Sequence, residues 1–298
     1  MTISSHPRLL LVIVSVIAAL LYGCDSGSTP STSANAPVSS VPSPQPVISL
    51  TFGIVPQQSA SKLAGLWIPI MEHVGKEAGV KLEFKTAPDI PEFEKRCRDG
   101  IYQIAYMNPF HYTEFHKAPG YIAVAKQKGK KIQGILVAKK EYVVDKDFKV
   151  LSGETLAFPA PDAFAATKLP TADLENKNIE FGRKYVNSHD SVYRAVAQGL
   201  YPAGGGIIRT FRNVAEDVSS QLKIIHRTKQ YTPHAFAIHP SVDPGTRSRI
   251  ADALINLEAT ARGRELLNSI KFDGIETAKN EDWEDVRKID LSPIIFQD

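Results

Sequence analysis

The 298-residue sequence has little cysteine and no strong excess of charge of either sign. Cys24 and Cys97 are its only cysteines, so at most one disulfide bond could form within the chain. The formal net charge of +3 is too small to indicate the basic surface that nucleic-acid binding requires. The one local cluster of basic residues, Lys126 to Lys131, is expected to be a solvated hairpin turn. We therefore expect no nucleic-acid partner.

The sequence also lacks an apolar run long enough to span a membrane as a helix, which takes roughly 20 residues. Its longest run, Leu9 to Leu21, follows an arginine and ends at Leu21-Tyr22-Gly23-Cys24. A positive start, a short apolar stretch and a small residue before the cut are typical of a secretory signal peptide. The Leu-x-Gly-Cys ending resembles the lipobox of bacterial lipoproteins, whose cysteine carries the lipid. Residues 1–23 are therefore predicted to be a signal peptide, with Cys24 as the lipidation site.

The segment after this cysteine predicts where the protein resides. Asp25 resembles the signal that keeps lipoproteins in the inner membrane of Gram-negative bacteria. We expect the protein to be lipid-anchored on the periplasmic side of the inner membrane, or on the outer face of the cell membrane if the host has a single membrane. Residues 24–47 are rich in Ser, Thr, Pro and Ala and contain no aromatic residue. Such a segment buries too little apolar surface to offset the entropy of ordering, and it is predicted to be a disordered tether.

The remaining residues alternate strand and helix patterns. Ile48 to Val55 is predicted to be a strand, and the apolar residues between Leu63 and Val74 recur at helical spacing. Further strands are expected at 80–86, 102–107, 134–139, 155–158, 185–187, 222–226 and 235–239, and further helices at 91–99, from about 163, 191–199, 246–257 and 263–269. A body of this size is near the limit of one hydrophobic core. We predict an α/β protein of two lobes, with residues 48–136 and 235–298 in lobe 1 and residues 137–234 in lobe 2.

Several residues that suggest chemistry have simpler structural explanations. Cys97 lies one helical turn after Phe93 and is expected to be a buried thiol. Gly204-Gly205-Gly206 lacks the ending of a P-loop and is interpreted as flexible backbone at a cleft edge. His111 and His116, like His234 and His239, are five residues apart, which does not align two metal ligands on a helix. We expect no metal site, no cofactor and no enzymatic activity, because no nucleophile or carboxylate pair is recognisable.

Specific strings of the sequence resemble a known family. They are Phe52-Gly53-Ile54-Val55-Pro56, Trp67-x-Pro69, Ile104-Ala105-Tyr106, Ala157 to Ala165, and Ser188-His189-Asp190 followed by Ala195-Val196-x-x-Gly199. Together they look like the phosphate/phosphite/phosphonate-binding proteins, the phosphonate-binding branch of the type II periplasmic binding proteins. The resemblance implies a two-lobed Venus-flytrap fold in which each lobe is a mixed sheet flanked by helices. It also implies a monomeric receptor that binds a small-molecule anion and meets the permease of an ABC importer.

Candidate ligand-binding residues follow the strands. Ligands of open α/β sheets bind beyond the carboxyl ends of the strands, where helix N-termini also favour an anion. The candidates are Gln57, Gln58, Ser59, Tyr106, Asn108, Asp162, Phe164, Thr167, His189 and Arg209. The resemblance implies ligand contacts for Tyr106 and His189. Arg209 is either a bidentate anion clamp or a member of a surface ion pair.

The second-lobe loop departs from the family pattern. Phosphonate receptors of the family carry a run of serine and threonine at the start of a helix, whereas this chain has Asp162-Ala163-Phe164-Ala165-Ala166, with Thr167 as the first hydroxyl. Asp162 either caps the helix or faces the cleft, where its charge would repel a dianion. The predicted output is import of a phosphonate-, phosphite- or phosphate-like solute. The alternative is a lipoprotein of the same fold that senses a ligand and signals to a membrane partner.

Overall fold

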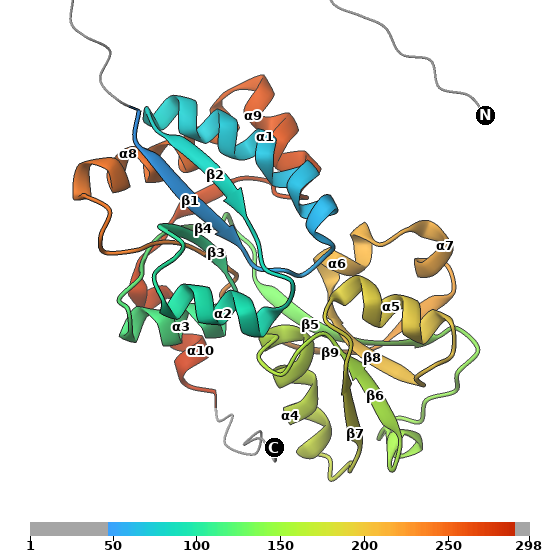
Figure 1. Ribbon diagram of the computed structural model, residues 1–298. Coiled ribbons are helices and arrows are strands. Elements are labelled where there is room, and N and C mark those ends of the chain that lie inside the picture. Colours follow the sequence, from blue (N-terminus) through green and yellow to red (C-terminus); the bar gives the residue numbers. More distant parts are fainter. Residues whose placement is uncertain (1–46, 290–298) are drawn as a thin grey trace, which may run out of the picture. The chain divides into compact units, whose positions relative to one another are not determined.

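The computed structural model describes residues 47–289, which form two β-sheets with flanking helices (Figure 1). The predicted signal peptide, Cys24 and nearly all of the predicted tether lie outside the described residues. Within residues 47–289, no helix combines the length and apolar character that a membrane span needs. The alternation of strands and helices confirms the predicted α/β class.

The first sheet contains strands from both ends of the described chain. Its order is β11-β4-β10-β3-β1-β2, where β1 is Ser49–Ile54, β2 Lys81–Lys85, β3 Ile104–Met107, β4 Ile122–Gln127, β10 Ala235–Ile238 and β11 Ile275–Thr277. Strands β1, β2 and β3 are parallel, and Phe52 lies opposite both Phe84 and Ile104. Strand β10, from the late part of the chain, pairs with both β3 and β4 and is antiparallel to them. The late part of the chain thus returns into the sheet begun by the early part.

Helices cover both faces of the first sheet (Figure 1). On one side α1 (Ala60–Ala78) contacts α8 (Pro244–Ile255) and α9 (Ala261–Ser269), and on the other α3 (Pro109–Lys117) contacts α2 (Ile90–Arg98) and α10 (Glu284–Arg287). The 3₁₀ turns η3 (Asn256–Ala259) and η4 (Asn280–Trp283) precede α9 and α10. Most of the apolar stripe predicted in α1 is buried, namely Leu63, Trp67, Ile70, Met71 and Val74. The helix ends before Gly79, whose φ of 68° suits glycine. In α2, Phe93 and Cys97 are fully buried, which confirms the predicted structural thiol.

The second sheet has the order β7-β6-β8-β5-β9. Its strands are β5 (Ile132–Lys139), β6 (Thr155–Phe158), β7 (Gly182–Tyr185), β8 (Ala203–Ile207) and β9 (Leu222–Tyr231). Its helical elements are η1 (Lys149–Leu151), the π-helical turn η2 (Phe164–Lys168), α4 (Leu169–Glu175), α5 (His189–Ala197), α6 (Ile208–Asn213) and α7 (Glu216–Ser219). Strand β5 is antiparallel to both of its neighbours, while β6 is parallel to β7 and β8, so the sheet is mixed.

Two short segments connect the sheets. Residues 128–131 join β4 to β5, and residues 232–234 join β9 to β10. The prediction of a hairpin turn at Lys126 to Lys131 was therefore wrong, because β4 and β5 belong to different sheets and do not pair. A short segment of lysines and glycine has the same sequence pattern in a hairpin turn and in a connection between two sheets. Only the pairing of the flanking strands distinguishes the two.

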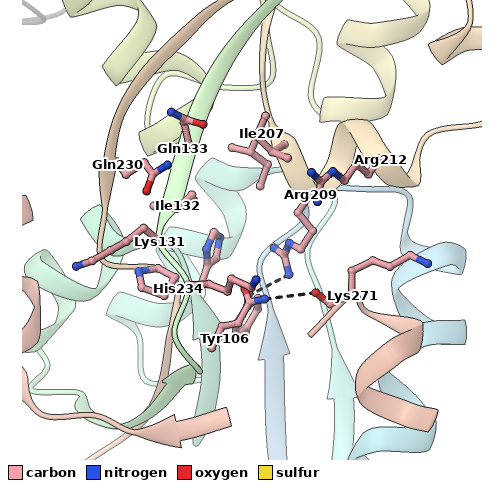
Figure 2. Close-up of a pocket in the computed structure, with 14 residues that line it drawn as sticks. Tyr106, Lys131, Ile132, Gln133, Ile207, Arg209, Arg212, Gln230, His234 and Lys271 are labelled. Carbon is pink, nitrogen blue, oxygen red and sulfur yellow. Dashed lines mark hydrogen bonds between the residues drawn. The ribbon is translucent and has the colours of Figure 1, made fainter. Parts of the chain in front are cut away.

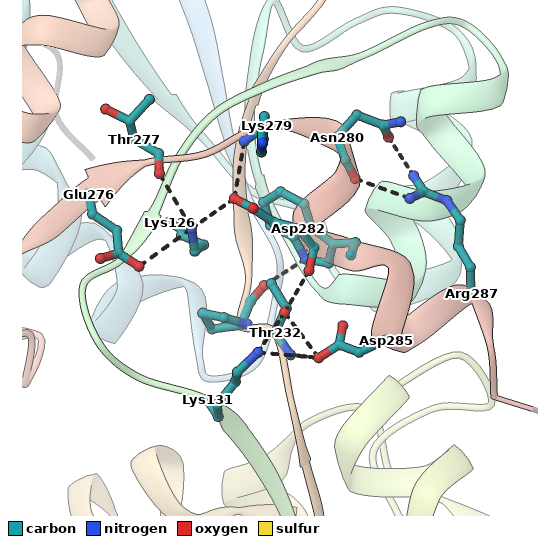
Figure 3. Close-up of polar contacts among 12 residues, drawn as sticks. Lys126, Lys131, Thr232, Glu276, Thr277, Lys279, Asn280, Asp282, Asp285 and Arg287 are labelled. Carbon is teal, nitrogen blue, oxygen red and sulfur yellow. Dashed lines mark hydrogen bonds and ion pairs between the residues drawn. The ribbon is translucent and has the colours of Figure 1, made fainter.

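Residues 282–285 are hydrogen-bonded to both of the segments that connect the sheets (Figure 3). The Asp285 carboxylate accepts hydrogen bonds from the Thr232 backbone N–H at 2.8 Å and from the Lys131 ammonium at 3.3 Å. The Thr232 hydroxyl donates to the carbonyl of Asp282 at 2.7 Å, and the Trp283 indole N–H donates to the carbonyl of Pro233 at 2.9 Å. Residues 282–285 thus hold the two connecting segments against the first lobe.

The tract Gly204-Gly205-Gly206 is a buried central strand, so its interpretation as flexible backbone at a cleft edge was wrong. Each glycine allows a neighbour to approach where a side chain would not fit. An ideal Cβ on Gly205 would lie 1.9 Å from the carbonyl oxygen of Ala166, and one on Gly206 would lie 2.1 Å from the hydroxyl of Tyr193. Glycine within a strand often marks such close approach of other chain segments. Three successive glycines lack the β-branched side chains that normally indicate a strand, which explains the error.

Replacing one of these glycines tests the close packing. We expect Gly205→Ala to lower the free energy of unfolding by about 1–3 kcal/mol or more, because overpacking forces η2 away from β8. Gly65→Ala is the matched control, since the residue is inside α1 and no atom outside its chain neighbours and its own helix backbone lies within 4 Å of its ideal Cβ. The control is expected to raise stability by up to about 1 kcal/mol, since alanine favours helix. Urea unfolding of both variants measures the difference, and equal effects would contradict the packing explanation.

Candidate ligand site between the two sheets

Most of the predicted ligand-binding residues come together where the loops of the two sheets meet. Gln57, Gln58, Tyr106 and Asn108 follow β1 or end β3, and all four are buried. The backbone N–H of His189, from the second lobe, donates to the carbonyl of Gln57 at 3.1 Å. Ser59 is the exception, because it is exposed at the start of α1 and its hydroxyl lies 3.4 Å from that of Ser61.

Arg209 lies at the centre of this region. It extends from α6 toward the first lobe, where its guanidinium donates to the Tyr106 hydroxyl at 3.0 Å (Figure 2). It also donates to the Gln57 side-chain oxygen at 2.6 Å. The guanidinium also lies 5.6 Å from the ring centres of both Tyr106 and Phe272. Within residues 47–289, Arg209 forms no ion pair with a carboxylate. Of the two alternatives for Arg209, the structure thus disfavours the surface ion pair and leaves an uncompensated cation between the lobes.

The hydrogen bonds of Gln57 determine the protonation of His234. Because the Gln57 side-chain oxygen accepts from Arg209, its amide nitrogen faces Nε2 of His234, at 2.8 Å. An amide nitrogen only donates, so His234 accepts through Nε2 and is neutral. Burial, reinforced by the nearby Arg209 cation, holds the pKa of His234 well below its ordinary value. The ring also stacks on Tyr106, with centres 5.0 Å apart and planes 19° apart.

Sequence reasoning considered His234 only as a metal ligand and missed its place in this site. The residue immediately precedes β10, at the second connection between the sheets. Once the strand order is known, a histidine in a segment that connects the two sheets can be recognised as a candidate site residue. Within residues 47–289, no cluster of three or more His, Cys, Asp or Glu side chains has an arrangement that could hold a metal ion.

His189 is buried at the start of α5 and is directed toward its own lobe. Its Nδ1 lies 3.0 Å from the Thr210 hydroxyl, which also contacts the Tyr193 hydroxyl at 2.7 Å. Burial, together with the positive charge of Arg209, lowers the pKa of His189 to about 3. The ring is therefore neutral at pH 7 and adds no charge to the site.

The second-lobe loop around Asp162 is held by an ion pair and by hydrogen bonds. Asp162 does not cap a helix, because its carboxylate pairs with the ammonium of Lys168 at 2.6 Å and no side-chain cap precedes η2. The Asp162 carbonyl accepts from the Asn108 side chain at 3.1 Å, which links the two lobes. The Thr167 hydroxyl donates to the carbonyl of Ala160 at 2.7 Å, and Phe164 is buried in the core cluster of the first lobe. The capping alternative for Asp162 was wrong because a nearby lysine competes for the carboxylate.

Two cavities adjoin Arg209. The smaller, of about 20 Å³, is lined by Gln57, Gln58 and Thr210 among others, and the side-chain nitrogen of Gln58 is buried there without a hydrogen-bond partner. The larger, of about 230 Å³, is shown in Figure 2. It is lined by Tyr106, Gln127, Lys130, Lys131, Ile132, Gln133, Ile207, Ile208, Arg209, Arg212, Gln230, Pro233, His234 and Lys271. A buried donor without a partner, beside an arginine without a carboxylate, is suited to an anion.

Comparison with known proteins identifies the family. A model of the ABC transporter, phosphonate, periplasmic substrate-binding protein family matches residues 52–283. The chain belongs to this family. Its members are the substrate-binding components of transporters rather than enzymes, and they work outside the cytoplasm. The resemblance expected from the sequence strings is thereby confirmed.

Individual relatives agree with this assignment. Over 216 residues, 65% of this chain and 67% of the relative, the chain is 23% identical to the phosphate-import protein PhnD of Mycolicibacterium smegmatis. The binding protein component of an ABC phosphonate transporter from Pseudomonas aeruginosa has a similar structure, with a TM-score of 0.75, 15% identity and coverage of 81% of this chain and 85% of that chain. PhnD1 of Prochlorococcus marinus in complex with methylphosphonate gives a TM-score of 0.74, 14% identity and coverage of 80% and 96%. The two-lobed type II fold is thus confirmed.

The depressed pKa values of His189 and His234 predict a dependence of stability on pH. His189 has its ordinary pKa in the unfolded chain and a pKa of about 3 in the folded protein, so its contribution is fully present above about pH 6.5. As the pH falls from about 6.5 toward 3, the unfolded state binds the proton first and the free energy of unfolding decreases. The slope for one such group is up to about 1.4 kcal/mol per pH unit.

Chemical unfolding across this pH range tests the prediction. We expect His189→Gln to reduce the slope relative to the unmodified protein, because the titrating group is gone. Gln198→Asn, which changes an exposed residue without a titrating group directly after α5, is the control and should leave the slope unchanged. An unchanged slope in His189→Gln would contradict the assignment of a buried neutral ring.

Proposed function

We propose that the protein is a lipid-anchored, monomeric receptor that binds a small tetrahedral oxyanion of the phosphate, phosphite or phosphonate kind between its lobes and delivers it to the permease of an ABC importer. The observation that carries this proposal is Arg209. Its guanidinium is held by Tyr106 and Gln57, and it has no carboxylate partner within residues 47–289.

The donors around Arg209 suit an oxyanion better than a neutral solute. Charge-assisted hydrogen bonds from a guanidinium to phosphate are roughly twice as strong as neutral ones. The Gln58 amide nitrogen, buried and without a partner in the adjoining cavity, supplies a further donor. Leaving such a donor unsatisfied costs about 1–3 kcal/mol, which a ligand oxygen would offset.

The loop that supplies hydroxyls in the family pattern makes a different contribution here. Ala163, Phe164, Ala165 and Ala166 are buried, and the hydroxyl of Thr167 already donates to a carbonyl of its own loop. We infer that phosphoryl oxygens are bound from the Arg209 side of the cleft instead. PhnD1 of Prochlorococcus marinus was solved with methylphosphonate, and the Mycolicibacterium smegmatis relative is named a phosphate-import protein, which supports a ligand of this chemical group.

Binding would also favour association of the lobes. The donors come from both lobes, because Gln57 and Gln58 follow β1 and Tyr106 lies in β3 of the first sheet, whereas Arg209 follows β8 of the second. A ligand that contacts both lobes stabilises the conformation in which they are together, through its differential affinity for that state. This conformation is the form that a permease would receive.

Ligand-induced stabilisation tests the oxyanion site. We expect methylphosphonate, phosphite or phosphate to raise the melting temperature, since ligand at one hundred times Kd adds about 2.7 kcal/mol to the stability of the folded state. Arg209→Gln should abolish the increase, because the charge that binds the anion is gone. Arg194→Gln removes an exposed arginine of α5 as a matched control and should retain it. No stabilisation of the unmodified protein by any of these anions would exclude the proposed ligand class.

The lipid anchor is tested separately in a bacterial host. We expect the protein to incorporate a labelled fatty acid and to sediment with membranes, because Cys24 ends a Leu-x-Gly-Cys sequence. Cys24→Ser should lose the label, whereas Cys97→Ser, at the buried thiol, should keep it. Labelling that survives Cys24→Ser would show that the anchor is elsewhere or absent.

A further inference from the structure

The larger cavity beside Arg209 has a one-sided distribution of charge. Five of its lining residues are basic, namely Lys130, Lys131, Arg209, Arg212 and Lys271, and none is an aspartate or glutamate. The other polar side chains of its wall include the amides of Gln127, Gln133 and Gln230, while Ile132 and Ile207 provide apolar surface. Such a wall favours a ligand that carries more negative charge than a single oxyanion group.

Two of the five cations are already paired outside the cavity lining. Lys130 contacts Asp273 at 2.8 Å and Lys131 contacts Asp285 at 3.3 Å. For Arg209, Arg212 and Lys271, no ion pair is found within residues 47–289. Within residues 47–289, no carboxylate therefore neutralises the positive charge of these three side chains.

The three unpaired cations come from both lobes. Arg209 and Arg212 lie three residues apart in α6, and residues at this spacing share a face of a helix. Lys271 follows α9 in the first lobe, where its backbone carbonyl accepts a hydrogen bond from the Gln127 side chain at 3.3 Å. Arg209 is bound between the lobes by Tyr106 and Gln57, whereas Arg212 and Lys271 are exposed. One cation therefore lies deep and two lie near solvent.

The size of the cavity also exceeds what a tetrahedral anion needs. Its volume of about 230 Å³ compares with roughly 30 Å³ for one water molecule in the liquid. It remains below the roughly 300–1,000 Å³ of pockets for drug-sized ligands. A small metabolite with a substituent beyond its oxyanion group fits between these limits.

We propose that the ligand is an extended dianion, an organic phosphonate or phosphate whose substituent ends in a second negatively charged group. The tetrahedral group binds at Arg209, and the second anionic group binds at Arg212 and Lys271. This inference rests on the proposed oxyanion site and specifies the class of ligand that the site accepts.

Calorimetric titration with four probes tests the inference. Methylphosphonate reports the oxyanion site alone, and propylphosphonate adds a neutral tail. Phosphonoacetate carries a carboxylate on its tail, and 2-aminoethylphosphonate carries an ammonium. We expect phosphonoacetate to bind at least about tenfold more tightly than propylphosphonate, and 2-aminoethylphosphonate to bind more weakly than propylphosphonate, because the tail meets unpaired cations.

Substitution of the outer cations locates the effect. In the double variant Arg212→Gln/Lys271→Gln, the ratio of the phosphonoacetate and propylphosphonate affinities should fall to about one. The control Arg194→Gln/Lys184→Gln removes the same charge from exposed positions outside the cavity lining and should keep the tenfold ratio. Raised salt should lower the ratio in the unmodified protein, since exposed charges are screened.

The outcomes separate this inference from the proposed function. If methylphosphonate and propylphosphonate bind but phosphonoacetate gains nothing, or if its gain survives the double variant, the extended-dianion inference is wrong while the oxyanion site stands. If no phosphonate binds, both are wrong. A tenfold gain that the double variant removes and the control retains would establish the second anionic subsite.

Discussion

The guanidinium of Arg209, placed between two lobes without a carboxylate partner, is the constraint on which the site depends. It sets the orientation of Gln57, and through Gln57 it requires His234 to be a neutral acceptor. Its charge also contributes to the low pKa of His189 and of His234. Desolvating a cation is unfavourable unless dipoles or an anion compensate its charge. The surrounding hydroxyl, amide and aromatic groups compensate Arg209 in part, and a bound anion would complete the compensation.

The fold supports this arrangement by close packing. Strand β8 leads directly into α6, and its three glycines let the π-helical turn η2 and Tyr193 lie against the strand. Tyr193 in turn contacts Thr210, the neighbour of Arg209. The region around the arginine therefore depends on close contacts that a larger side chain at Gly205 or Gly206 would prevent. Residues 282–285 are hydrogen-bonded to the connecting segments (Figure 3), and Lys131 and Pro233 of those segments line the larger cavity.

Parts of the fold with strong local patterns were predictable. The α1 stripe, the strands at 81–85 and 155–158 and the buried pair Phe93 and Cys97 follow from periodicity and helix spacing. Strands β4 and β8 were missed, and β7 lies at Gly182–Tyr185 rather than at 185–187. Of the candidate site residues, Gln57, Tyr106, His189 and Arg209 do meet in space, whereas Ser59 is exposed apart from them.

The sequence by itself determined the family, the α/β class and the candidate arginine, because these depend on local strings and on periodicity. Only the tertiary structure decided that Arg209 lacks a carboxylate partner in the described chain, that Asp162 pairs with Lys168, and that His234 belongs to the site. Which charges meet depends on strand order and on the two connections between the sheets. Residues 103 positions apart, such as Tyr106 and Arg209, become hydrogen-bonded neighbours only after both sheets have formed.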